Sequence, residues 1–191
     1  MVVVADPSQS IYVETKDREI LAKRWSPLGG MLEIPNSYRN PTNIAAVAAL
    51  FLDPKRHSAA DFMRRVKGRI GNTRPIWHQV ANNDEQINAI CQIIAETRGS
   101  VRIGLLYRHR KHLEQDYNAF QKRHVSVQLA LTQSANIDFN RPLPVMTTAH
   151  SAKGLEFDWV ILPSLDTDKW DGDPKDDKER NLFFVALTRA K

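Results

Sequence analysis

Apolar residues recur in two patterns along this chain of 191 residues. In several segments they return every three to four positions, which is typical of an amphipathic helix. The clearest case is 84–98, where Ile87, Ile90, Cys91 and Ile94 share one face. Short continuous apolar runs between these segments are typical of buried strands. The expected helices are 41–52, 59–70, 84–98, 109–123 and 179–190, and the expected strands are 2–4, 74–80, 101–107, 125–131, 145–148 and 158–163.

Strands and helices therefore alternate, and this order predicts an α/β domain with a mainly parallel sheet flanked by helices. Ligands of such sheets bind at the carboxyl ends of the strands. Asn40 is expected to be the N-cap of a helix with Pro41 at its first position. The run 158–163 is expected to be a strand buried on both faces.

Composition narrows the class of protein only a little. The chain has 42% hydrophobic residues, enough for a core, and its net charge of +5 permits a polyanionic partner but fits an ordinary basic protein equally well. The single Cys91 cannot form an internal disulfide, which favours a reducing, intracellular setting. The sequence has no apolar run of the roughly 18 residues that a membrane span needs, and its first residues lack the features of a signal peptide.

Four stretches carry candidate chemistry, and two of them are short and weak when taken alone. In DPSQSIY, Gln9 follows the opening strand and could donate to a phosphate oxygen or orient a water, although a solvated Gln is the simpler interpretation. In NSYRNP, Tyr38 offers a flat face for a base and Arg39 a planar cation for phosphate. A packing tyrosine beside a surface arginine explains the same residues.

The third stretch, TAHSAKGLEFDWVIL, places polar residues between two predicted strands. Its candidate residues are Thr148, His150, Lys153, Gly154 and Glu156. Gly154 permits close approach of a ligand to the backbone, so the order suits a loop that contacts a nucleotide or nucleic acid. His150 and Glu156 have no third ligand at suitable spacing, so no metal site is expected. Ser151 lacks the G-x-S-x-G turn of a serine hydrolase.

The fourth stretch, ERNLFFVALTRA, ends in Arg189, and the four together resemble the superfamily 1 DNA helicases of the UvrD/Rep type. DPSQSIY resembles motif III, SYRNPTNI motif IV, VMTTAHSAKGLEFDWVIL motif V and ERNLFFVALTRA motif VI. GLLYRHRKHLEQ resembles the strand and helix between motifs IV and V. The motifs stand in the family's order and cover the chain from end to end. The resemblance implies a RecA-like fold, with residues 1–30 as a remnant of the first RecA-like domain and 31–191 as the second.

The resemblance also implies roles for individual residues. Gln9, Arg39 and Arg189 would be catalytic, with Gln9 sensing the γ-phosphate and the two arginines clamping it as arginine fingers. Tyr38 would stack on adenine, and Glu156, aided by Gly154, would place the nucleotide. The cofactors would be ATP and Mg²⁺, with the metal held mostly by the first RecA-like domain. The residues implied in DNA contact are Thr148, His150, Lys153 and Arg108.

Departures from the family pattern limit these expectations. The chain has no G-x-x-x-x-G-K-[ST] loop, so it is expected to be a fragment that hydrolyses no ATP by itself and binds it weakly. The short stretch between Arg39 and Val145 leaves no room for a large accessory subdomain. After Tyr12 the family's base-stacking aromatic is not evident. The expected partners are single-stranded DNA or a duplex junction and the first RecA-like domain, in a cytoplasmic, nucleoid-associated setting, and oligomeric state stays open.

Several alternatives remain. The chain could be a non-catalytic, helicase-like module that binds DNA or a protein, although three γ-phosphate sensors would serve no purpose there. His109 and His112, the basic face of 59–70 and the acidic loop 166–177 are interpreted mainly as solvated surface. Tryptophans that could stack a base more commonly anchor a core or a loop; they are Trp77, Trp159 and Trp170.

Overall fold

A computed structural model describes residues 36–52, 58–68, 74–132, 137–165 and 176–191. The predicted first segment 1–30, with Gln9, and most of the acidic loop lie outside the described residues. The elements are α2 (Thr42–Ala49), α3 (Ala59–Arg65), α4 (Asn83–Thr97), β1 (Ile103–Tyr107), α5 (Arg110–Lys122), β2 (Gln128–Ala130), β3 (Val145–Thr148), β4 (Trp159–Ile161) and α6 (Asp177–Leu187). Among the described residues, no helix is long and apolar enough to cross a membrane.

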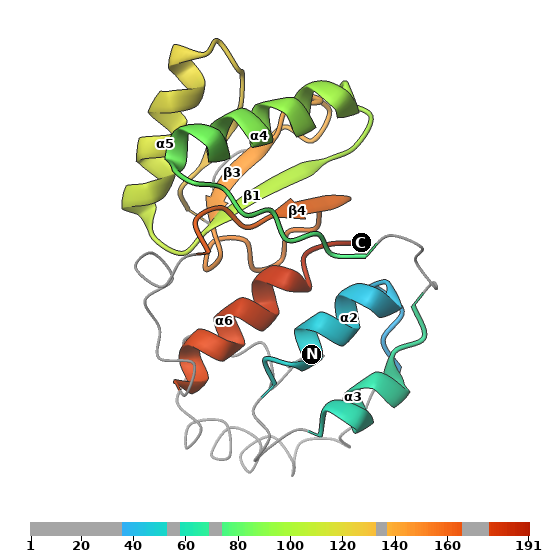
Figure 1. Ribbon diagram of the computed structural model, residues 1–191. Coiled ribbons are helices and arrows are strands. Elements are labelled where there is room, and N and C mark those ends of the chain that lie inside the picture. The colour runs from blue at the N-terminus through green and yellow to red at the C-terminus, as the bar shows by residue number, and fades with distance from the viewer. Residues whose placement is uncertain (1–35, 53–57, 69–73, 133–136, 166–175) are drawn as a thin grey trace.

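The four strands form one sheet in the order β2-β3-β1-β4, and every pairing is parallel. Helices α4 and α5 lie on one side of this sheet, and α6 lies on the other side together with α2 and α3 (Figure 1). All residues of β1 are buried because the strand is central in the sheet and covered on both faces. The predicted α/β architecture with a parallel sheet between helices is confirmed.

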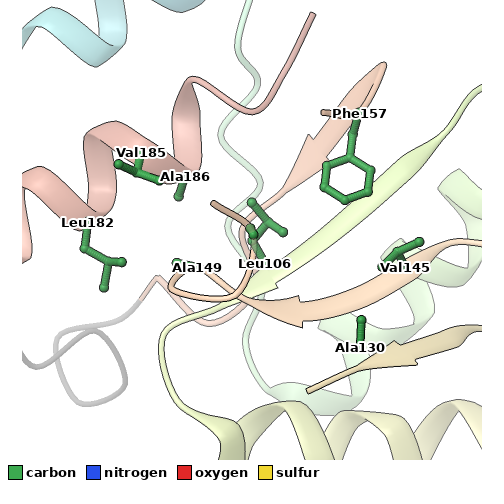
Figure 2. Packing of buried hydrophobic residues seen from close by; sticks show 9 residues of the cluster. Leu106, Ala130, Val145, Ala149, Phe157, Leu182, Val185 and Ala186 are labelled. Atoms are coloured by element: carbon green, nitrogen blue, oxygen red, sulfur yellow. The ribbon is translucent and has the colours of Figure 1, made fainter. Parts of the chain in front are cut away.

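Side chains of β1 alternate between two cores, as the strand period requires. Leu105 and Tyr107 pack with residues of α4 and α5. Leu106 points the other way and packs with Phe157 and α6 (Figure 2). Gly104 makes room for that packing, since a Cβ at this position would lie 2.5 Å from the Phe157 ring. This close contact holds the chain segment that leads into β4 against the centre of the sheet.

Two strand predictions are wrong, because both depended on which strands lie next to each other in the sheet, and the sequence does not reveal this. Residues 74–80 form no regular structure, and Ile76 and Trp77 are 82% and 72% exposed. An apolar run without a hydrogen-bonding partner does not become a strand. Strand β4 is at the edge of the sheet, and Trp159 in it is 47% exposed, so this strand is not buried on both faces.

The helix predicted over 59–70 ends early because its last residues pair with another segment. Val66 has an extended backbone and forms a parallel bridge with Ser37. The amide of Ser37 donates to the Arg65 carbonyl at 2.8 Å, and the Lys67 amide donates to the Ser37 carbonyl at 2.7 Å. This pairing fixes the backbone of the SYRN stretch from one side.

The N-cap predicted at Asn40 is also wrong. Pro41 occupies the N-cap position of α2, and no side chain caps that helix. Asn40 is instead buried, and its side-chain amide donates to two carbonyls beyond the end of α6. The Asn40 side chain therefore donates to two distant carbonyls, whereas the predicted N-cap would have accepted from a nearby backbone N–H.

Candidate functional site

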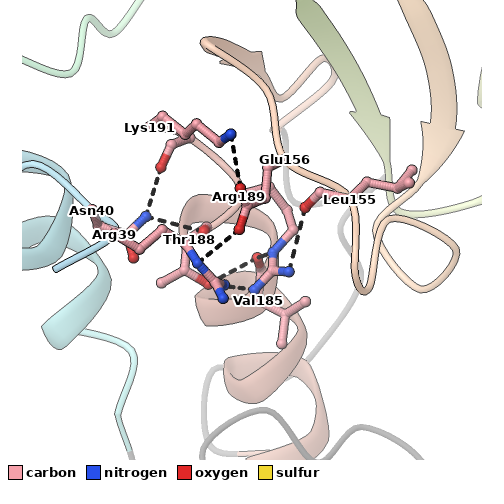
Figure 3. A network of polar contacts seen from close by, with 9 residues as sticks. Arg39, Asn40, Leu155, Glu156, Val185, Thr188, Arg189 and Lys191 are labelled. Carbon is pink, nitrogen blue, oxygen red and sulfur yellow. Dashed lines mark hydrogen bonds and ion pairs between the residues drawn. The ribbon is translucent and has the colours of Figure 1, made fainter. Parts of the chain in front are cut away.

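Three stretches that are far apart in the sequence meet beside the end of α6. Arg39 comes just before α2, Glu156 lies in the loop between β3 and β4, and Arg189 and Lys191 follow α6. Together with Asn40 they form what we call the Glu156 cluster (Figure 3). The parallel bridge between Phe157 and Ala190 brings the β3–β4 loop to the end of α6. The fold thus brings Arg39, Glu156 and Arg189, three of the residues predicted to bind the nucleotide, into one cluster.

Glu156 accepts from two cations in this cluster. Its Oε1 lies 2.9 Å from Arg39 Nε, and its Oε2 lies 2.8 Å from Lys191 Nζ. The hydrogen bond from Lys191 lowers the pKa of Glu156, and the positive charges of Arg39 and Arg189 act in the same direction, whereas partial burial opposes them. Glu156 is therefore ionised at neutral pH. The Arg39 side chain is 42% exposed, so a ligand can reach it.

Arg189 has a different environment from Arg39, since it is only 2% exposed. Its Nε donates to the Val185 carbonyl at 3.0 Å, and its terminal nitrogens lie 3.4 Å from the Leu155 carbonyl and 3.3 Å from Thr188 Oγ1. The guanidinium thereby satisfies acceptors at the C-terminal end of α6, where helix carbonyls lack intrahelical partners. The predicted finger is in the cluster, and it donates there to two backbone carbonyls and to the Thr188 hydroxyl.

Tyr38 and Gly154 are exposed at the surface. In the sequence they stand shortly before Arg39 and Glu156, two residues of this cluster. The Tyr38 side chain is exposed, and its hydroxyl lies 3.4 Å from Asn36 Nδ2. Gly154 has a φ of +91°, and a Cβ there would meet nothing within 4 Å. Glycine is thus required by the left-handed backbone rather than by crowding. Their roles on a nucleotide stay predictions.

The residues predicted to contact DNA lie at the carboxyl edge of the sheet. Tyr107 and Thr148 are paired in the β1–β3 register, so the chain leaves both strands at neighbouring points. Thr148 Oγ1 accepts from the Ser151 amide at 3.2 Å, which shapes the turn that follows β3. Lys153 is exposed in that turn. The arrangement leaves Lys153 accessible and uses the Thr148 hydroxyl within the loop.

His150 and Arg108 lie at the same edge, close to α6. Burial lowers the pKa of His150, the positive charge of Arg108 lowers it further, and the negative charge of Glu179 partly opposes both. His150 is therefore neutral at pH 7. Arg108 Nε donates to Glu179 Oε2 at 2.8 Å, and its Nη2 donates to the other carboxylate oxygen. These side chains are only 19% and 16% exposed, so Arg108 is engaged in a fold contact.

Sequence reasoning missed three residues of these sites. Asn40 was placed as a helix cap because it precedes proline, and Lys191 belongs to no motif that was weighed. Glu179 opens the motif VI stretch, and only its place at the start of a helix beside a parallel sheet could have suggested a contact with Arg108. Among the residues that the structure describes, no group of three His, Cys, Asp or Glu side chains could hold a metal ion.

Comparison with known proteins connects part of this chain to one family. Residues 127–191 match the family of UvrD-like helicase C-terminal domains. A protein of Mycoplasma pneumoniae named "Probable DNA helicase" is 34% identical over 102 residues, which cover 47% of this chain and 16% of that protein. The predicted resemblance to the C-terminal portion of a UvrD-type helicase is confirmed. The chain spans about a sixth of that curated relative, so the activity of a whole UvrD-type protein is a matter for proposal.

A solved structure shares the fold of this chain. The crystal structure of the C-terminal domain of a possible DNA helicase from Lactobacillus plantarum WCFS1 aligns with a TM-score of 0.54 and 19% sequence identity. The alignment covers 81% of this chain and 82% of the other. At this identity the likeness supports the architecture alone. It agrees with the parallel sheet and flanking helices described above.

Proposed function

We propose that this chain is the C-terminal part of an ATP-dependent DNA helicase or translocase, and that it contributes cationic residues to the γ-phosphate and loop residues to DNA. The observation that supports this most directly is the convergence of Arg39, Glu156 and Arg189 from three distant stretches. Cations gathered around a single carboxylate fit an anionic ligand such as a triphosphate. The same donor set does not fit Mg²⁺, which prefers oxygen ligands.

Arg39 is the residue best placed to meet a phosphate. It is 42% exposed and bound to Glu156 through Nε, so its terminal nitrogens can turn to a phosphate oxygen while Lys191 keeps Glu156 neutralised. Glu156, still in contact with Lys191, would then hold the nucleotide, and Tyr38 would offer its exposed ring to the base. When bound, ATP with Mg²⁺ would supply the γ-phosphoryl group, and its transfer to water would drive movement along the DNA strand.

Arg189 would have to exchange its backbone acceptors for phosphate oxygens when the two RecA-like domains close. The carbonyls of Val185 and Leu155 and the hydroxyl of Thr188 are neutral acceptors, and a charged phosphate oxygen is a stronger acceptor than any of these. A first RecA-like domain elsewhere in the parent protein would supply the phosphate loop and the metal ligands. The chain alone is therefore expected not to hydrolyse ATP.

The carboxyl edge of the sheet would contact single-stranded DNA or a duplex junction. Lys153 is exposed and offers a charge to the phosphate backbone. His150 is neutral at pH 7, so it would donate a hydrogen bond through its ring rather than contribute a charge. Arg108 would act through the fold, because Glu179 holds it. Such a protein would work inside the cell, near its DNA.

A second candidate function is favoured by the burial of Arg189. A nearly fully buried arginine that donates to the Val185 and Leu155 carbonyls and to the Thr188 hydroxyl is compatible with a non-catalytic module that keeps the fold and binds DNA or a protein. In that case the guanidinium would be a structural cap for α6. The two functions differ in what happens to ATP turnover when Arg189 is removed.

The test is ATP hydrolysis by the full-length parent, with and without single-stranded DNA, for wild type and Arg189→Ala. DNA-stimulated hydrolysis should fall by roughly 10³-fold or more, as it does when an arginine finger is lost in other NTPases. Arg141→Ala, a change at an exposed loop position, is the matched control and should retain activity. A melting curve of each variant shows whether the loss reflects unfolding. No hydrolysis by the wild type, with DNA binding retained, would leave the binding module as the function.

A further inference from the structure

Asn40 connects the two arginine segments of the Glu156 cluster. It is 6% exposed, and its Nδ2 donates to the Thr188 carbonyl at 3.0 Å and to the Ala190 carbonyl at 2.6 Å. These are the carbonyls of the residues directly before and after Arg189. Arg39 is the residue directly before Asn40. One side chain thus bridges the backbone that carries one arginine to the backbone that carries the other.

The acceptors that Asn40 uses have few alternatives. Helix α6 ends at Leu187, and carbonyls at a helix C-terminus have no intrahelical donor. A primary amide provides two N–H groups on one nitrogen, so a single Asn can serve both carbonyls. Asp has the same shape but would present oxygen to oxygen, and Ala would leave both carbonyls without this donor. The site therefore selects Asn for its chemistry rather than its size.

Asn40 is also fixed on its other side. The bridge between Ser37 and Val66 holds the backbone that leads to it. Gly68 packs so closely on Asn40 that an added Cβ would overlap its carbonyl oxygen. The side chain that donates these hydrogen bonds to the end of α6 is therefore attached to a backbone that cannot shift freely. Such a fixed connection can set the relative position of Arg39 and Arg189.

We propose that Asn40 is a positioning residue, which rests on the proposed function above: it holds Arg39 and Arg189 in register so that both can reach one γ-phosphate. The Arg39–Glu156 ion pair cannot perform this task, since the phosphate itself would displace it. The hydrogen bonds that the Asn40 side chain donates involve no group that would bind the phosphate. They persist when Arg39 leaves Glu156, and they keep the two arginine segments at one spacing during the reaction.

The experiment uses the full-length parent and compares wild type, Asn40→Ala and Asn40→Asp in steady-state ATP hydrolysis with saturating single-stranded DNA. Misplacement of a catalytic group by about 1 Å can cost about 100-fold in rate. We therefore expect kcat to fall about 10- to 100-fold in both variants, with little change in KM or in DNA affinity. Asn118→Ala, at an exposed position of α5, is the matched control and should behave as wild type.

Two further comparisons separate positioning from a loss of stability. Ile87→Val trims a buried residue of α4 outside the Glu156 cluster, so it lowers stability and should leave kcat unchanged. Asn40→Ala is also introduced into the Arg39→Ala background. If Asn40 acts by aligning Arg39 with Arg189, it should cost less than about threefold once Arg39 is gone, because groups that act as a unit are not additive.

The outcomes for the two proposals are distinguishable. A wild-type parent without ATP hydrolysis overturns the proposed function, and the positioning role falls with it. If the wild type is active and loses activity in Arg39→Ala and Arg189→Ala, but Asn40→Ala matches Asn118→Ala, the positioning role alone is overturned. An equal loss from Asn40→Ala in both backgrounds also overturns it, since that result shows a general structural effect.

Discussion

Two arginine–glutamate pairs lie in the two predicted sites, and they are built differently. Arg39 meets Glu156 through Nε, and these side chains are 42% and 33% exposed. Arg108 meets both oxygens of Glu179, and those side chains are 19% and 16% exposed. The first pair has a second cation, Lys191, on its carboxylate. The second pair joins the end of β1 to the first turn of α6.

The difference shows which arginine can exchange its partner for a ligand. An exposed ion pair with one contact is worth about 0–1 kcal/mol, so a phosphate can replace it at little cost. A half-buried pair with two hydrogen bonds is geometrically specific, and separating it leaves a charge without its partner. Arg39 is therefore suited to ligand binding. Arg108 is suited to holding the DNA-facing edge in place, although both arginines were predicted to touch ligands.

The largest effect that would test this difference is expected when the half-buried arginine, Arg108, is removed. Arg108→Ala leaves Glu179 without the partner that meets both of its oxygens, and we expect a loss of about 2–3 kcal/mol in the free energy of unfolding. Urea unfolding monitored by circular dichroism measures this loss. Arg110→Ala removes an exposed arginine paired with Glu114 within α5, and it should cost less than about 0.5 kcal/mol. Equal losses in the two variants would contradict the structural role of Arg108.

A smaller effect is expected when the contact between Gly104 and Phe157, the residue after Glu156, is disturbed. Gly104→Ala would force the Phe157 ring to move, since the new Cβ would lie 2.5 Å from it. Overpacking of this kind costs about 1–3 kcal/mol, and one methyl group places the expected loss near about 1–2 kcal/mol. Phe157 exchanges backbone hydrogen bonds with Arg189 and Lys191, so the change should also disturb the cluster. Thermal unfolding of the variant tests the first expectation.

The corresponding control for Gly104 is a glycine with open space. Gly154→Ala meets no atom within 4 Å, and its cost should come only from the φ of +91°. The forced left-handed conformation costs about 1 kcal/mol for a residue with a side chain. A Gly104→Ala variant as stable as wild type would show that the Phe157 ring is not held against β1.

The smallest effect is expected at the exposed pair. Glu156→Gln should change the free energy of unfolding by less than about 1 kcal/mol at neutral pH and low salt. Because the pKa of Glu156 lies below its ordinary value of 4.5, its ionised form stabilises the fold above that value, and the contribution is lost as the pH falls through the lower folded-state pKa. Unfolding curves of wild type and variant should therefore converge in acid. A difference that grows toward low pH would have the wrong sign.

Much of the fold was predictable because local patterns determine it. The helix predicted over 84–98 matches α4, and the strand predicted over 101–107 matches β1 apart from its first two residues, since both patterns are properties of the local chain. The strand predicted at 74–80 failed because a strand needs a partner, and composition does not supply one. The burial of β4 failed for a related reason, since the place of a strand in a sheet depends on all the others.

In the candidate site, too, some features follow from the sequence and others depend on contacts between distant segments. The resemblance of the sequence to a helicase family predicted that Arg39, Glu156 and Arg189 act on one nucleotide, and the structure places these three side chains in one cluster. Only the tertiary structure decided that Arg189 is buried against carbonyls and that Asn40 and Lys191 complete the cluster. Lys191 and Glu156 are 35 positions apart and Asn40 and Ala190 are 150 apart, so these contacts depend on how the chain folds back on itself. No local pattern of residues encodes them.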